Sequence, residues 1–295
     1  MIRLVAPHWG WGNPRCRGLP LSVSETLVVV SPHLDDAVLS LGATLAEAAH
    51  KGIAVINLTV FGGDPSSAAP PSYWDRKAGF SSAGAAARAR RTEDAAACAL
   101  IGMRPVWLPF LDHPYGGDHR EIDHTDVWSA AKPVLKRADL VLVPGFPLDH
   151  PDHAWVTRLI YEHEDELGWI GQYVEQPYAE LEWSGQRRVP EREPLLVGPR
   201  RESISWTRSL PTASAWVLKH RALLRYNSQV RAIASPSARL LARTALSEFA
   251  RGGEYVALPE RLAAKATTER DDAWSPPMND RPNYRGIRRS EPVDC

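Results

Sequence analysis

The sequence predicts an α/β fold: a Rossmann-like, mostly parallel sheet with helices on both faces, in a single domain with irregular C-terminal additions. Short apolar, β-branched segments alternate with longer segments whose apolar residues recur at helical spacing. The alternation persists through residue 144, which is typical of strand–helix–strand units. We expect the domain to span 1–263, and the polar, Pro- and Arg-rich remainder, 264–295, to be poorly ordered or to lie on the surface.

The first strand–helix–strand unit is predicted directly by local pattern. Residues 26–31 (TLVVVS) form a β-branched run, as in a strand covered on both faces. A helix is predicted over 37–51, because its apolar residues recur at helical spacing and Gly52 suits the position after a helix. Residues 53–61 (IAVINLTVF) predict the second strand. The Gly-, Pro- and Ser-rich segment 62–84 favours a long surface loop.

The same alternation continues along the chain. An alanine-rich helix over 85–101 precedes a short strand at 105–110 (PVWLPF), a helix at 125–137 and a strand at 139–144 (DLVLVP). The next helix begins near Pro151, because proline is tolerated in the first turn.

Beyond residue 171 the pattern is less regular. Apolar and β-branched stretches still indicate short strands, and longer Ala- and Leu-containing stretches indicate helices. We expect strands at 172–177, 202–207 and 254–258, and helices at 213–226 and 236–250.

Composition disfavours several classes of protein. The 35 basic and 35 acidic residues cancel, so we expect no nucleic-acid partner, which would call for a strongly basic surface. Cys16, Cys98 and Cys295 are scattered and lack CxxC spacing, which favours a reduced, cytoplasmic setting over a disulfide framework. There is neither a signal-peptide pattern nor a run of about 18 apolar residues, so we expect a soluble protein without a membrane partner.

Two clusters of His and Asp residues each follow a predicted strand. His33, Asp35 and Asp36 follow the first strand, and the sequence HPDH at 150–153 follows the strand at 139–144. Open α/β sheets bind ligands at the carboxyl ends of their strands. Catalytic zinc is typically held by three His or Asp ligands with a position left open for water. Singly, such a His can hydrogen-bond a turn and such an Asp can cap a helix, but together the clusters indicate a metal site.

Four stretches together resemble one family, the PIG-L/LmbE-like zinc-dependent N-acetylglucosaminyl deacetylases. SPHLDDAVLS resembles its PHPDDE signature, and HPDH resembles its second signature. RRTEDAAACALIGM resembles its R-x-x-E helix, and KHRALLRYNSQ at 219–229 resembles its K-x-x-A-x-x-x-Y-x-S-Q helix. The stretches occur in the family's order over roughly residues 26–230.

The resemblance implies a metal centre with separate ligands and base. His33, Asp36 and His153 would bind zinc, and Asp35 would act as general base on the zinc-bound water. Adjacent aspartates cannot easily both bind one metal from a tight turn, so one ligand and one base is chemically sensible. Zinc lowers the pKa of its water to about 7, and a nearby carboxylate can take the proton. Because two His and one carboxylate also suit Fe(II), iron is an alternative metal.

The resemblance also implies residues around the reacting carbonyl and the sugar. His150 would face the carbonyl and, when protonated, stabilise the oxyanion, while Asp152 would orient His150 and balance its charge. The leaving amine would collect a proton from Asp35 or His150. Arg90 would lie close to the sugar, its alternative being a local ion pair on the helix surface. Asp112 would accept a hydrogen bond from a sugar hydroxyl.

Three positions depart from the family pattern. Ala37 stands where a glutamate usually closes the first signature, and Leu34 replaces its second proline. Leu148 occupies a position where some relatives carry a tyrosine that can reach the reaction centre, so His150 would work without that help. None of the three is an expected metal ligand.

We therefore expect a metal-dependent hydrolase that removes the acetyl group from an N-acetylated amino sugar, a small-molecule substrate. The Ala-, Arg- and Pro-rich composition suggests a high-GC bacterial source, where such enzymes act on sugars of glycosylated antibiotics and on thiol conjugates. One alternative is an amidase that cleaves a larger acyl group from a glucosamine conjugate, as in the mycothiol-conjugate amidases. The other is a catalytically inactive sugar-binding module of the same fold. The sequence does not indicate an oligomeric state.

Overall fold

The computed structural model describes most of the predicted domain. The described residues are 19, 25–66, 68–115, 122–179, 204–229 and 253–262. The helix expected at 236–250 and the tail at 264–295 lie outside them.

The described strands form one seven-stranded sheet in the order β3-β2-β1-β4-β5-β7-β6. The first five strands in this order pair in parallel, whereas β7 is antiparallel to both β5 and β6. The predicted mostly parallel sheet is thus confirmed. The strands are β1 (Thr26–Ser31), β2 (Ala54–Thr59), β3 (Arg104–Trp107), β4 (Leu140–Phe146), β5 (Trp169–Val174), β6 (Ile204–Ser209) and β7 (Glu254–Pro259).

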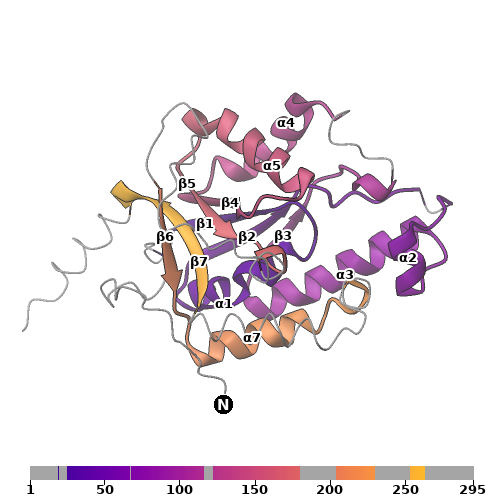
Figure 1. The fold of residues 1–295 in the computed structure, drawn as a ribbon, viewed down its shortest axis with the longest axis horizontal. Helices are drawn as coiled ribbons and strands as arrows, with labels where there is room; N and C mark the ends of the chain where they lie inside the picture. The colour runs from indigo at the N-terminus through magenta and orange to yellow at the C-terminus, as the bar shows by residue number, and fades with distance from the viewer. Residues whose placement is uncertain are drawn as a thin grey trace, which may run out of the picture.

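Helices cover both faces of the sheet, as predicted (Figure 1). One face carries α1 (Asp36–His50), α3 (Ala83–Ile101) and α7 (Ala213–Leu223), which pack on one another. The other face carries α4 (His124–Leu135) and α5 (Pro151–Glu162). Short 3-10 helices occur at His113–Tyr115 and Glu164–Glu166.

The β-branched run of β1 explains how the central strand supports two cores. Leu27 and Val29 lie in the apolar cluster beneath α1 and α7, whereas Val28 and Val30 lie in the cluster beneath α4 and α5. All four side chains are fully buried. A strand covered on both faces requires apolar residues at successive positions, which is why apolar and polar residues do not alternate in β1.

The segment 62–84 contains a helix, so the expected long loop is wrong there. Helix α2 spans Tyr73–Ala78. The Ser72 hydroxyl accepts a hydrogen bond from the Asp75 N–H (3.1 Å), and the Asp75 carboxylate accepts one from the Ser72 N–H (2.8 Å). Gly79 ends the helix at φ +94°, a left-handed conformation that favours glycine. A Ser-x-x-Asp capping box within a Gly- and Pro-rich stretch is the signal that composition obscured.

The strand order reverses direction between β1 and β4, and this places the site. From β1 the chain proceeds to β2 and β3 on one side, whereas β4 and β5 extend the sheet on the other. In doubly wound sheets the crevice beyond the carboxyl ends at such a point is the usual ligand site. Both His- and Asp-containing clusters follow these two strands.

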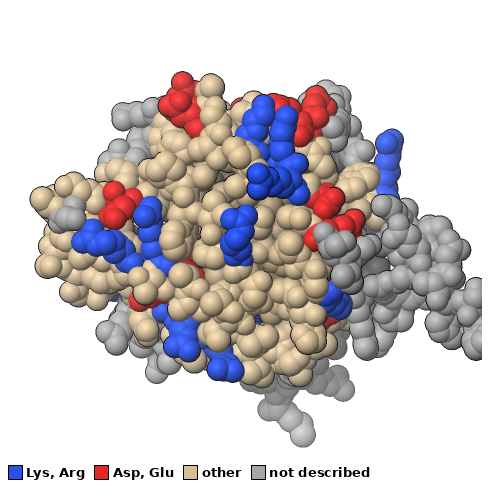
Figure 2. Space-filling model, turned by 180° about the vertical axis from the view of Figure 1, so that it is seen from behind, with Lys and Arg blue, Asp and Glu red and all other residues tan. Residues whose placement is uncertain are grey.

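Charge is mixed on the face of the molecule shown in Figure 2, where basic and acidic side chains are interspersed among residues of other types. Within the part of the chain that the structure describes, no helix combines the length and apolarity that crossing a bilayer would need.

Candidate metal centre

A tight turn after β1 presents the first cluster. The His33 N–H donates a hydrogen bond to the Asp36 carboxylate (2.7 Å). The Ser31 hydroxyl donates to the His33 carbonyl (2.6 Å) and accepts from the Ala37 N–H (3.1 Å), so it joins the end of the strand to the start of α1. Ala37, where a glutamate was expected, is fully buried against the core and serves the turn through its backbone.

The start of α5 presents the second cluster. His150 is the N-cap residue, and its Nδ1 accepts a hydrogen bond from the Asp152 N–H (3.3 Å). Pro151 occupies the first helical position, where its missing N–H costs no hydrogen bond. His153, two residues further on, is fully buried and points back toward the end of β1. Two clusters about 120 residues apart in sequence therefore meet at one edge of the sheet.

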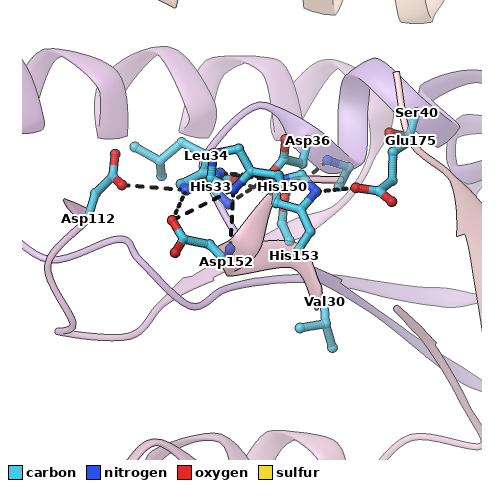
Figure 3. Close-up of polar contacts among 12 residues, drawn as sticks. Val30, His33, Leu34, Asp36, Ser40, Asp112, His150, Asp152, His153 and Glu175 are labelled. Carbon is cyan, nitrogen blue, oxygen red and sulfur yellow. Dashed lines mark hydrogen bonds and ion pairs between the residues drawn. The ribbon is translucent and has the colours of Figure 1, made fainter. Parts of the chain in front are cut away.

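Three donor atoms form a nearly equilateral triangle (Figure 3). The Asp36 carboxylate oxygen Oδ2 lies 3.2 Å from His33 Nδ1 and 3.3 Å from His153 Nε2, and the two nitrogens are 3.3 Å apart. A tetrahedral ion with ligand bonds of about 2.0–2.1 Å sets its ligand atoms about 3.3 Å apart. The three residues expected as ligands therefore fit a divalent ion at this place, and they include both His and carboxylate donors.

The ring nitrogens that point away from the triangle contact carboxylates. His153 Nδ1 hydrogen-bonds Glu175, whose other oxygen accepts the Leu148 N–H (2.8 Å). His33 Nε2 lies 3.2 Å from the Asp152 carboxylate and 3.5 Å from that of Asp112. Such partners fix which nitrogen faces a metal and raise its basicity.

Sequence reasoning missed Glu175. The residue follows β5, the neighbour of β4 in the parallel part of the sheet, and is almost completely buried. A carboxylate at the end of a third parallel strand was the available signal. By contrast, Asp112 was predicted and does lie beside the cluster, beyond His33 on the side opposite Glu175 (Figure 3).

Asp152 lies beside His150, as expected, and lies still closer to His33. Its carboxylate is 3.9 Å from His150 Nδ1 but only 3.2 Å from His33 Nε2. The backbone N–H of Asp152 already bonds His150 Nδ1, which leaves the carboxylate to orient His33. His33, His150 and Asp152 also lie close enough to form a second grouping of potential ligand atoms, which shares His33 with the first.

The two adjacent aspartates differ in their electrostatic surroundings. Burial, followed by the neighbouring Asp36 carboxylate, raises the pKa of Asp35 to about 7. Burial also acts to raise the pKa of Asp36, but His153 and His33 outweigh it and hold that pKa well below its usual range. Asp36 is therefore a persistent carboxylate, whereas Asp35 titrates in the range that suits a general base.

The three histidines also differ. Burial opposes protonation of all three, but neighbouring carboxylates overcome it for two: Asp112 raises the pKa of His33 well above its usual value, and Asp36 raises that of His153 to about 9. Burial and the charges of His33 and His153 lower the pKa of His150 to about 4. The surroundings of His150 thus favour its neutral form, unlike the protonated form expected from the sequence.

Arg90 makes contacts that the sequence did not reveal. Its guanidinium lies 2.8 Å from the carboxylate of the fully buried Asp75 and hydrogen-bonds the Tyr115 hydroxyl. That hydroxyl donates to the same Asp75 oxygen (2.8 Å). Arg90 Nε is buried and has no hydrogen-bond partner among the described residues. Contact between Arg90 and a sugar stays a prediction.

Residues of the R-x-x-E and K-x-x-A-x-x-x-Y-x-S-Q stretches contact the turn after β1 and each other. The Tyr226 hydroxyl lies 2.7 Å from the Asp94 carboxylate and 3.1 Å from the Leu34 carbonyl, within the turn that presents His33. Glu93 accepts hydrogen bonds from the N–H (3.0 Å) and hydroxyl (2.6 Å) of Ser228. These contacts join α3 to the segment after α7.

Comparison with known proteins agrees with the motifs. The family model PIG-L, described as GlcNAc-PI de-N-acetylase, matches residues 28–163. No curated protein matches the sequence. A deacetylase from the biosynthetic pathway of teicoplanin is 26% identical, with a TM-score of 0.63 over 79% of this chain and 97% of its own. The A40926 pseudoaglycone deacetylase is 27% identical, with a TM-score of 0.63 over 79% and 96%.

The fold alone extends to a different activity. The 4-carboxy-2-hydroxymuconate hydratase GalB from Pseudomonas putida is 16% identical, with a TM-score of 0.52 over 80% of this chain and 95% of its own. The architecture alone therefore does not determine the reaction, whereas the motifs and the residues of the site bear on it. In its four motifs, in the family match over residues 28–163 and in its likeness to the two deacetylase structures, the chain is similar to the PIG-L/LmbE-like deacetylases.

Proposed function

We propose that this chain is a metal-dependent deacetylase that removes the acetyl group from an N-acetylglucosaminyl moiety. The observation that carries the proposal is the triangle of His33, Asp36 and His153 donor atoms, 3.2–3.3 Å apart, with Asp35 next to it in sequence. Support comes from the PIG-L match and from the two similar deacetylases. The amidase alternative uses the same residues and differs in the acyl group released.

The proposed metal ligands are His33, Asp36 and His153, and the proposed metal is zinc. Bound there, a divalent ion acts as a Lewis acid and lowers the pKa of water to about 7. Another ion, such as Fe(II), suits the same donors. One structure of teicoplanin deacetylase, 25% identical to this chain, is described as a zinc-inhibited form, so several ions should be compared.

In the proposed reaction Asp35 takes the proton of the water that attacks the acetyl carbon. The same proton then passes from Asp35 to the amine nitrogen as the C–N bond breaks, and acetate and a free amine leave. A base whose pKa lies near 7 suits both transfers. Asp152 and Glu175 hold the rings of His33 and His153 in place from behind.

The proposed substrate contacts lie on the Asp112 side of the site. Asp112 accepts a hydrogen bond from a sugar hydroxyl, and Arg90, held by Asp75 and Tyr115, lies near the sugar. The names of the similar deacetylases point to a sugar carried on an antibiotic, which makes glycosylated secondary metabolites the first substrates to test.

Mass spectrometry tests the proposal. The metal-loaded protein is incubated with free N-acetylglucosamine, an N-acetylglucosaminyl antibiotic and an N-acylated glucosamine thiol conjugate. We expect the antibiotic to lose mass corresponding to replacement of acetyl by hydrogen. Release of the larger acyl group from the thiol conjugate instead would favour the amidase, and binding without any release would favour an inactive sugar-binding module.

Variants separate metal binding from catalysis. Asp35→Asn should abolish acetate release and keep the metal, whereas His153→Ala should lose the metal itself. Asp126→Asn, an exposed aspartate of α4, is the matched control and should behave as the unmodified protein. Metal loss in the Asp35 variant would contradict its assignment as base.

A further inference from the structure

Tyr178 lies against the two histidines of the second cluster. Its ring centroid is 5.3 Å from that of His153, edge to face at 82°, and 5.9 Å from that of His150. Neither the sequence motifs nor the four resembling stretches include it. It follows Glu175 by three residues, so the segment after β5 supplies both the carboxylate behind His153 and a phenol beside it.

The segment that carries Tyr178 is held at both ends. The Ala179 N–H donates to the Glu175 carbonyl (2.9 Å), and the Gln176 N–H donates to the Ser40 hydroxyl of α1 (3.1 Å). Ala179 and Gln176 are buried, whereas Tyr178 is half-buried. The backbone that carries the phenol is thus held against α1 and the end of β5, and the ring packs on His153 and His150.

The Tyr178 hydroxyl is available to a ligand. Among the described residues none forms a hydrogen bond to it. A tyrosine hydroxyl, with an ordinary pKa of about 10, carries its proton near neutral pH and can act as a neutral donor or acceptor. A phenol hydroxyl that has no hydrogen-bond partner among the described residues, on a ring that packs against His153, is suited to an oxygen atom of a bound substrate.

The position distinguishes the acetyl group from the sugar. Asp112 lies beyond His33, on the side of the site opposite His153 and Glu175 (Figure 3). Tyr178 packs on His153 and His150, so it lies at the other end from Asp112. If the sugar occupies the Asp112 side, the reacting carbonyl is the part of the substrate that reaches Tyr178.

We propose that Tyr178 is a further catalytic residue, whose hydroxyl donates a hydrogen bond to the acetyl carbonyl oxygen and to the oxyanion into which that oxygen develops. This inference rests on the proposed deacetylase function. The proton stays on Tyr178 throughout, and no bond to it forms or breaks. Preorganised donors aimed at a developing oxyanion are among the strongest contributions to acyl-transfer catalysis.

The test is Tyr178→Phe, which keeps the ring and its packing and removes only the hydroxyl. Loss of one oxyanion donor lowers kcat by about 10²–10³-fold. We expect that loss in kcat, with KM and metal content unchanged. Tyr73→Phe is the matched control, because Tyr73 is 65% exposed on α2, and it should leave kcat unchanged.

A second readout does not need turnover. Acetohydroxamate presents a carbonyl and a metal-binding oxygen, and calorimetry measures its affinity for the metal-loaded protein. A hydrogen bond to a charged group is worth about 10-fold or more in affinity, so Tyr178→Phe should bind this probe about 10–100-fold more weakly.

The two readouts separate the two proposals. If the unmodified protein releases no acetate but the variant still binds acetohydroxamate more weakly, the deacetylase function fails and the hydrogen bond from Tyr178 stands. If the unmodified protein turns over and the variant matches it in kcat and in probe affinity, the inference is wrong. A change confined to KM would also overturn it, because that would assign Tyr178 to holding the sugar.

Discussion

Replacement of Asp94 by Asn probes how the protein supports the turn that presents His33. Asp94 is fully buried, and its carboxyl group accepts hydrogen bonds from the Trp107 indole N–H and the Tyr226 hydroxyl, each 2.7 Å long. The Tyr226 hydroxyl also lies 3.1 Å from the Leu34 carbonyl. One hydroxyl proton cannot serve both oxygens fully. When Asp94 is protonated, it donates to Tyr226, and Tyr226 donates to Leu34.

The size of the effect follows from the pKa of Asp94. Burial raises it from the ordinary 3.8 to about 6. The folded chain therefore binds this proton more tightly than the unfolded chain. Protonated Asp94 therefore stabilises the folded state. This contribution to the unfolding free energy is complete below about pH 4 and is lost as the pH rises through about 6. A shift of about two pKa units at 1.36 kcal/mol each amounts to about 3 kcal/mol.

Asparagine reproduces the protonated acid at all pH values. Its carbonyl oxygen accepts from Trp107, and its amide N–H donates to Tyr226, so the Leu34 carbonyl keeps its donor. Urea unfolding of both proteins between about pH 4 and pH 7 measures the difference in unfolding free energy. We expect the unfolding free energy of the Asp94→Asn variant, relative to that of the unmodified protein, to rise by about 3 kcal/mol as the pH increases across that range.

Other titrating groups cancel in this comparison, because both proteins contain them. Asp126→Asn is the control, since its side chain is exposed, and its difference from the unmodified protein should not change with pH. A difference for Asp94→Asn that is equally flat would refute the assignment of a tightly held proton to Asp94.

Three further outcomes are expected. Glu175→Gln should weaken metal binding about 10–100-fold, because it removes the charge that fixes the His153 ring. Chelator competition measures the metal affinity, with Glu162→Gln, at an exposed position, as the control. An unchanged affinity would contradict the role of Glu175 in orienting His153. Metal affinity should rise with pH up to about 9, because protons compete for His153; affinity that is constant with pH would argue against this ligand. Lys219→Met should lower the unfolding free energy by about 3–5 kcal/mol, since it removes the cation that pairs with the buried Glu254 carboxylate; a urea-unfolding loss below about 1 kcal/mol would contradict a stabilising role for this buried pair.

The fold could be predicted because its signals are local. Each of these signals depends on only a few neighbouring residues. They are the consecutive apolar residues of β1, the helical spacing in α1, and the glycines Gly52 and Gly102 that follow helices, and all are present in the structure. Helix α2 was missed because its capping box lies in a stretch whose composition indicates a loop. The described part of the C-terminal region agrees less closely in element length: α7 ends at Leu223, short of the expected 226.

The site could be predicted only in part. That both clusters meet follows from parallel strands ending at one edge of the sheet, and the structure brings His33, Asp36 and His153 together. Which ring nitrogen faces inward does not follow from residue spacing, and the approach of the Asp152 carboxylate to His33 depends on how the two turns pack in three dimensions. Glu175 and Tyr178 follow a strand with no His or Asp motif, and only the sheet order places them beside His153.

The central claim is that a metal held by His33, Asp36 and His153 enables release of acetate. The most direct measurement titrates metal-depleted protein with zinc or Fe(II) and follows bound metal and acetate released from an N-acetylglucosaminyl substrate together. We predict that acetate release rises in proportion to bound metal and levels off at a single ion per chain, while Asp35→Asn binds the same ion and releases none. Acetate release that is independent of bound metal, or that persists in the Asp35 variant, would contradict the account.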